Sequence, residues 1–85
     1  MKISKVREVK TPTRGTPLSA GIDFFIPSGI HETLGPGKSC LIPSGIKANV
    51  PENHALVAFN KSGVAVKKSL HVGACVVDED YQGEI

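Results

Sequence analysis

The 85-residue sequence is long enough for one domain at most. Its apolar residues are mainly aliphatic, and it contains no Trp. Ten Lys and Arg against eight Asp and Glu give a net charge of +2, which is too balanced for the dense basic face of a nucleic-acid scaffold. No apolar stretch approaches membrane-spanning length, and the N-terminus lacks the apolar core of a secretory signal, so we expect a soluble, intracellular chain.

Turn residues divide the chain into short segments. Nine Gly and six Pro leave room for short strands and almost none for a helix of three turns. Five segments are rich in the Val, Ile and Phe that strands favour: Ile22–Ile26, Cys40–Ile42, Ile46–Val50, Ala55–Phe59 and Ala74–Val77. The continuously apolar segment 74–77 is expected to be buried on both faces. The pattern predicts an all-β sandwich or barrel-like fold in a single domain over residues 1–85.

One pentapeptide occurs twice. Ile26-Pro-Ser-Gly-Ile30 recurs as Ile42-Pro-Ser-Gly-Ile46. Pro followed two residues later by Gly matches a type I turn with Pro second and Gly fourth, so we predict two similar turns rather than a structural repeat.

The two cysteines indicate the redox compartment. Cys40 and Cys75 lie inside apolar runs and have no CxxC spacing. We therefore expect two small buried hydrophobic residues in a reducing compartment.

The first segment that could carry chemistry contains Asp23, which follows Ala20 and Gly21 and lies inside an apolar strand. A carboxylate in such a place is costly unless it is hydrogen-bonded or near a metal ion. The structural alternative is an Asp at the start of a strand that accepts a bond from a nearby backbone N–H.

The second segment is Asn60-Lys-Ser-Gly-Val-Ala65, directly after an apolar run. Exposed backbone N–H groups, a hydroxyl and a Lys charge can together bind an anion. The glycine pattern of a nucleotide-binding P-loop is missing. The alternative interpretation is an ordinary polar turn.

The third segment closes the chain. An apolar strand runs into Asp78-Glu-Asp-Tyr-Gln-Gly83, and a new strand is expected from Glu84, which predicts a hairpin with an acidic tip. A carboxylate beside a buried strand can act as a general base on water, and Tyr81 can lie flat against a sugar or a base. A solvated turn is the alternative.

Taken in order, these segments resemble the motifs of the trimeric dUTP pyrophosphatase family. The three matches are Ala20-Gly-Ile-Asp-Phe24, Lys61-Ser-Gly-Val-Ala65 and Cys75-Val-Val-Asp-Glu-Asp-Tyr-Gln-Gly83. Between the first two, Ser44-Gly-Ile-Lys-Ala-Asn-Val-Pro51 is similar to the family's Thr-Gly-Ile…Pro strand. The resemblance covers nearly the whole chain, and its third motif is highly specific.

The resemblance implies a distorted jelly-roll (β-clip type) and a homotrimer whose active sites draw on more than one subunit. The implied reaction converts dUTP to dUMP and pyrophosphate, with Asp78 activating the water that attacks the α-phosphorus. Tyr81 is implied to pack on the deoxyribose, and the hairpin from Gln82 and Gly83 onward to read uracil. Substrate phosphates are implied to contact Lys61, Ser62 and Gly63. Asp23 is implied to act on Mg²⁺ indirectly, through the water shell of the ion. We expect neither nucleic acid nor a membrane as a partner.

The chain departs from the family pattern in three places. Lys61 stands where Arg is usual, so the bidentate phosphate contact is lost, and Cys75 replaces a Gly. The family's fourth motif and its Gly-rich arm have no match, so we expect a domain that is incomplete at the C-terminus, truncated after the third motif. Two alternatives remain: a non-catalytic trimeric module for binding or regulation, and a relative of dCTP deaminase.

Overall fold

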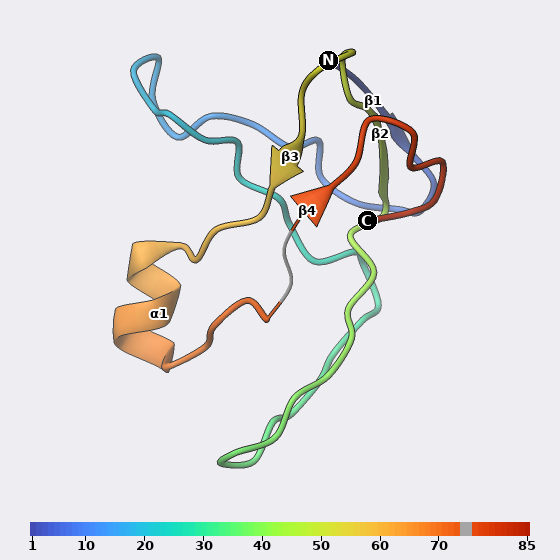
Figure 1. Cartoon of the computed structure of the whole chain (residues 1–85). Coiled ribbons are helices and arrows are strands. Elements are labelled where there is room, and N and C mark those ends of the chain that lie inside the picture. Colours follow the sequence, from blue (N-terminus) through green and yellow to red (C-terminus); the bar gives the residue numbers. More distant parts are fainter. Residues whose placement is uncertain (74–75) are drawn as a thin grey trace. The chain divides into compact units, whose positions relative to one another are not determined.

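Strands are the main regular elements of the chain. The computed structural model describes residues 1–73 and 76–85. Within these ranges it contains β1 (Lys2–Lys5), β2 (Ile46–Asn49), β3 (Leu56–Val57), α1 (Ser62–Lys68) and β4 (Val76–Val77) (Figure 1). The predominance of strands over helix confirms the coarse prediction of an all-β chain.

The strands form two separate two-stranded sheets. β1 pairs with β2, and β3 pairs antiparallel with β4 so that Leu56 lies opposite Val77 and Val57 opposite Val76. The chain divides into two compact units, one of residues 1–2 and 49–81 and the other of residues 3–48 and 82–85. We call these the strand–helix unit and the N-terminal unit.

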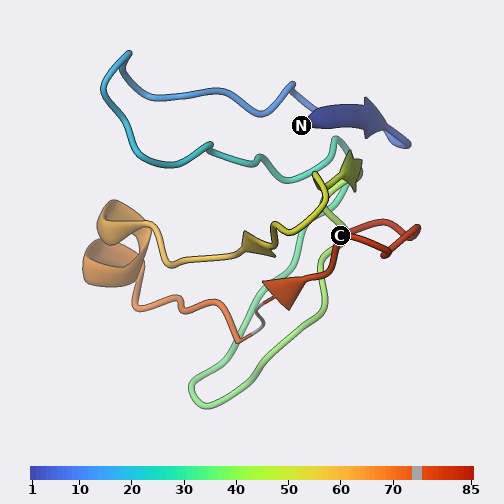
Figure 2. The same cartoon turned by 45° about the horizontal axis from the view of Figure 1, so that its top comes forward.

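The N-terminal unit packs around a few aliphatic side chains. Val9 and Ile46 are its buried hydrophobic residues, and Ile46 has no exposed surface. Pro12, Pro27 and Gly45 are buried as well. From this centre the chain makes an excursion through residues 31–41, all of them exposed, which Figure 2 shows as a long loop.

Two predicted strands do not form. Residues 22–26 make only a single antiparallel bridge, between Thr13 and Asp23, and residues 40–42 make no strand. Cys40 is exposed rather than buried, and Leu41 is 96% exposed. β-propensity requires a neighbouring strand to bond with, and residues 40–42 have none beside them in the described ranges. Cys75 and residue 74 lie outside the described residues.

The recurring pentapeptide folds differently from its predicted type I turn. In its first copy the N–H of Ile30 bonds to the carbonyl of Pro27, and Gly29 has a φ of 81°. Pro therefore stands first in the turn and Gly third, where a positive φ favours Gly. In the second copy Gly45 has a φ of 76°, but the N–H of Ile46 bonds to the Ser44 hydroxyl at 3.0 Å. The same five residues thus form two different local structures.

The strand–helix unit contains β3, α1 and β4. Among the described residues of this unit, Val50 is the buried hydrophobic one. Val76 of β4 is 55% exposed, so the expected burial of this strand on both faces is wrong. A two-stranded sheet leaves its faces open to solvent. α1 is only two turns long, which agrees with the predicted shortage of longer helices; Lys67 and Lys68 in its last turn favour the negative end of the helix dipole.

Candidate active site

Asp23 lies in a tight loop of the N-terminal unit. Its backbone N–H bonds to the carbonyl of Thr13 at 2.7 Å, and the Thr13 N–H bonds back to Asp23 at 3.1 Å. The half-buried side chain faces the turn around Gly15, where a Cβ would lie 3.9 Å from Asp23 Oδ2 and 3.6 Å from Ser19 Oγ. The backbone pairing places Asp23 opposite Thr13. A bond from a backbone N–H to the Asp23 carboxylate and a role of this carboxylate near a metal ion both stay predictions.

Lys61, Ser62 and Gly63 form the start of α1 instead of the turn that the sequence suggested. Lys61 is extended at the N-cap position, Ser62 is the first helical residue, and all three are exposed. A Cβ at Gly63 would meet no atom within 4 Å, so the backbone here is open to a ligand. Asn60 closes the excursion around α1, because its Oδ1 accepts the N–H of Val72 at 2.6 Å.

Asp78 opens a turn directly after β4. The N–H of Tyr81 bonds to the carbonyl of Asp78 at 3.1 Å, and Glu79 and Asp80 form the exposed tip. Glu79 Oε2 accepts the N–H of Asn53 at 2.9 Å, which fixes the tip against the turn at residues 51–54. The predicted acidic tip is confirmed, with Asp78 exposed and Tyr81 45% exposed.

Within the strand–helix unit, the segment that leads to α1 and the segment that begins at Asp78 leave opposite ends of the β3–β4 pair. β3 and β4 run antiparallel, and α1 follows the end of β3 whereas Asp78 follows the end of β4. The opposite directions of the two strands are visible in Figures 1 and 2. The chain therefore does not bring Ser62 and Asp78 to the same end of the sheet.

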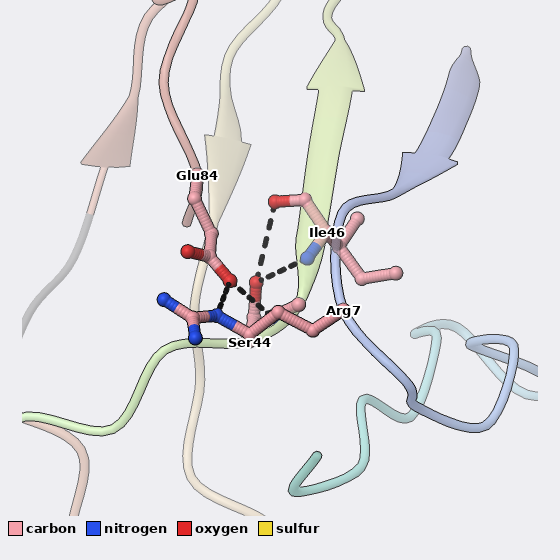
Figure 3. Close-up of polar contacts among 5 residues, drawn as sticks. Arg7, Ser44, Ile46 and Glu84 are labelled. Atoms are coloured by element: carbon pink, nitrogen blue, oxygen red, sulfur yellow. Dashed lines mark hydrogen bonds and ion pairs between the residues drawn. The ribbon is translucent and has the colours of Figure 1, made fainter.

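The residues after Tyr81 belong to the N-terminal unit, and they make contacts that the sequence did not predict. Glu84 and Ile85 form no strand; Ile85 instead accepts the N–H of Ser44 at 2.8 Å and donates to the carbonyl of Ile46 at 3.0 Å. Glu84 Oε2 accepts Arg7 Nε at 2.7 Å and the Gly45 N–H at 2.8 Å (Figure 3). Sequence reasoning missed this cluster because Arg7 and Glu84 are 77 positions apart.

The cluster lowers the pKa of Glu84 below its ordinary value of 4.5, mainly through the hydrogen bond from Arg7 and also through the Gly45 N–H and the Arg7 charge. The same contact raises the pKa of Arg7. Because the pKa of Glu84 is lower in the folded state, its ionised carboxylate stabilises the fold at pH values above the unfolded-state pKa. This stabilisation is lost as pH falls through the folded-state pKa.

We therefore expect the difference in stability between the wild type and Glu84→Gln to become smaller in acid. The urea midpoint of the wild type should exceed that of Glu84→Gln at neutral pH, and the gap should narrow as pH falls below 4.5. Glu32→Gln, in the exposed excursion, is the matched control and should show no such narrowing. A gap that stays constant into strong acid would contradict an ionic origin.

The described residues contain no group of three or more His, Cys, Asp or Glu side chains arranged to hold a metal ion. No helix in the ranges 1–73 and 76–85 has the length and apolar character needed to cross a bilayer.

Comparison with known proteins identifies the class to which these segments belong. Residues 7–85 match the dUTPase family, and the chain belongs to that family. Relatives named deoxyuridine 5'-triphosphate nucleotidohydrolase include one from Arabidopsis thaliana, 39% identical over 99% of this chain and 50% of its own length.

Two further relatives carry the same name. The protein of Chlamydia pneumoniae is 40% identical over 87% of this chain and 52% of its own length, and that of Mus musculus is 38% identical over 87% and 44%. The chain thus spans about half the length of the relatives it matches.

Proposed function

We propose that the complete protein containing residues 1–85 hydrolyses dUTP to dUMP and pyrophosphate. The observation that carries this proposal is the family match over residues 7–85, which includes all three polar segments in order. The relatives' name describes hydrolysis of deoxyuridine triphosphate. The exposed Asp78, held in a turn that closes immediately after β4, suits a general base on water.

Each polar residue then has a defined task. Asp78 removes a proton from the water that attacks the α-phosphorus, and Tyr81 packs on the deoxyribose where a 2′-hydroxyl would collide. Ser62, with the backbone of Gly63, donates to phosphate oxygens, and Lys61 adds a positive charge. Gln82 and Gly83 contact the uracil.

Asp23 suits an indirect role with Mg²⁺. Carboxylate oxygens are ligands that this ion accepts, and Mg²⁺ keeps several waters when it binds a triphosphate. The half-buried side chain of Asp23, whose backbone pairs with Thr13, can accept bonds from such waters. When bound, the ion neutralises charge on the triphosphate.

A homotrimer with shared sites agrees with the arrangement of the strand–helix unit. Ser62 and Asp78 follow opposite ends of the β3–β4 pair, so both can reach one substrate when they come from different copies. Closed symmetry repeats such a shared contact identically around the assembly. We propose that each copy folds as a single distorted jelly-roll domain and works in a reducing intracellular compartment.

The proposed function is tested by pyrophosphate release from dUTP, UTP, dCTP and dTTP, each with and without Mg²⁺. We expect selective turnover of dUTP that depends on Mg²⁺. Ammonia release from dCTP would instead identify a deaminase, and binding of dUTP without turnover would identify a non-catalytic module. Either result would contradict the proposal.

Tyr81→Ala tests the selection of deoxyribose. Loss of the ring should reduce the preference for dUTP over UTP by about tenfold or more, because about 1–2 kcal/mol of steric and packing discrimination disappears. The measurement is the ratio of kcat/KM for the two nucleotides. Tyr81→Phe, which keeps the ring, is the matched control and should preserve the ratio; an unchanged ratio in Tyr81→Ala would remove the residue from this role.

A further inference from the structure

We propose that Glu84 is a positioning residue for the adjoining substrate-binding residues Gln82 and Gly83, and that it acts through Arg7 and Gly45. This inference rests on the proposed function. It assigns a task to a contact cluster in the N-terminal unit that lies outside the three motifs.

The carboxylate of Glu84 is held from two directions. Its Oε2 atom accepts the Arg7 Nε–H at 2.7 Å and the Gly45 N–H at 2.8 Å. The Glu84 side chain is 23% exposed, compared with 49% for Arg7, so water competes less for the carboxylate than at an open surface. Charge-assisted bonds of this kind are stronger than neutral ones and fix direction as well as distance.

Gly45, which binds the Glu84 carboxylate, lies in a segment that is itself held by hydrogen bonds. The carbonyl of Gly45 accepts the Val6 N–H at 2.8 Å, and the Ser44 hydroxyl accepts the Ile46 N–H at 3.0 Å. Figure 3 shows the Ser44 hydroxyl bonded to Ile46 beside the Arg7–Glu84 pair. There is no space for a side chain at Gly45, because a Cβ there would lie 2.9 Å from Val9 Cγ1. The anchor for Glu84 is thus set by three chain segments: residues 6–9, 44–46 and 84–85.

The anchor restricts the residues that precede Glu84. Gly83 is joined to Glu84 through one peptide bond, so their Cα atoms are about 3.8 Å apart, and Gln82 is one step further. The backbone bonds of Ile85 to Ser44 and Ile46 fix the chain beyond Glu84. With the Glu84 side chain removed, Ile85 still holds the segment at its end, but the path of Gln82 and Gly83 is less restricted. Small displacements of binding groups have large effects on affinity and rate.

The test compares Glu84→Gln and Glu84→Ala in the complete protein. Gln keeps an oxygen for the Gly45 N–H and loses the ionic bond to Arg7, whereas Ala loses both. We expect the KM for dUTP to rise in the order wild type, Gln, Ala, by about tenfold to 100-fold in the last. The preference for dUTP over dCTP should fall in the same order, because the disturbed residues are those that contact the base.

A loss of folding alone gives a different result. A smaller folded fraction lowers kcat for every nucleotide and leaves KM and the base preference unchanged, and that outcome would overturn the positioning role. Glu32→Ala, which removes a carboxylate from the exposed excursion, is the control and should match the wild type. A wild-type protein that does not turn over dUTP would refute the proposed function itself; an active wild type with unaltered KM and base preference in Glu84→Ala would refute only this inference.

Discussion

Asp78→Asn is expected to lower kcat for dUTP by about 10²-fold to 10⁴-fold, the range that general-base catalysis contributes. The amide has nearly the same shape as the carboxylate but cannot accept a proton from water. The turn should survive, because its bond joins the Asp78 carbonyl to the Tyr81 N–H and uses no side chain. Pyrophosphate release at saturating dUTP is the measurement, with dUTP binding measured alongside.

Asp80→Asn is the matched control for this prediction. It removes the same charge from the same exposed turn, two residues further on, and should cause a much smaller loss. If Asp78→Asn kept wild-type turnover, the base would have to be another group. Equal losses in both variants would indicate that the charge of the turn, rather than one proton acceptor, supports the reaction.

Gly45→Ala should destabilise the fold more than the same change at an exposed glycine such as Gly29 or Gly37. A Cβ at this position would lie 2.9 Å from Val9 Cγ1 and 3.3 Å from Pro27 Cγ, so something buried must move. Gly45 also has a φ of 76°, which Ala adopts at a cost of about 1–2 kcal/mol. With about 1–3 kcal/mol for overpacking, we expect the free energy of unfolding to fall by about 2–5 kcal/mol.

Two controls separate the causes of this effect. Gly37→Ala places a methyl group at a φ of 72° with nothing within 4 Å, so it should show only the backbone cost. Val9→Ala in the Gly45→Ala background removes the nearest atom, Val9 Cγ1, but keeps Val9 Cβ at 3.2 Å. It should recover part of the packing loss, although Val9→Ala alone is destabilising. Urea unfolding measures all four proteins, and equal effects of Gly45→Ala and Gly37→Ala would contradict the clash.

Local sequence chemistry predicted the positions of some turns and strands, but neither the turn type of the recurring pentapeptide nor the helix that starts at Ser62. Gly35-Pro36-Gly37-Lys38 closes with a Lys38 N–H to Gly35 carbonyl bond, as Pro and Gly at the centre of such a turn favour. Residues 46–49 and 56–57 formed strands within the predicted segments. β1 was not predicted, because Lys2-Ile-Ser-Lys5 has little apolar character and becomes a strand only by pairing with β2.

The same division applies to the candidate site. The turn at Asp78 could be predicted because its residues are adjacent and favour turns. The helical start at Ser62 could not, since Ser and Gly favour turns in isolation and the short helix depends on its surroundings. No local pattern signals that Glu84 bonds to Arg7 and Gly45, because that contact depends on how distant segments fold together.

In the proposed trimer with shared sites, the antiparallel register of β3 and β4 would have a consequence for heredity. If the Ser62 and Asp78 of one copy belong to two different active sites because they lie at opposite ends of the strand pair, a defect in one segment leaves the other segment of that copy intact. Two inactive alleles, one changed at Ser62 and the other at Asp78, would then complement each other when both are expressed in one cell. Some active sites in a mixed assembly would then combine an intact Ser62 segment from one allele with an intact Asp78 segment from the other.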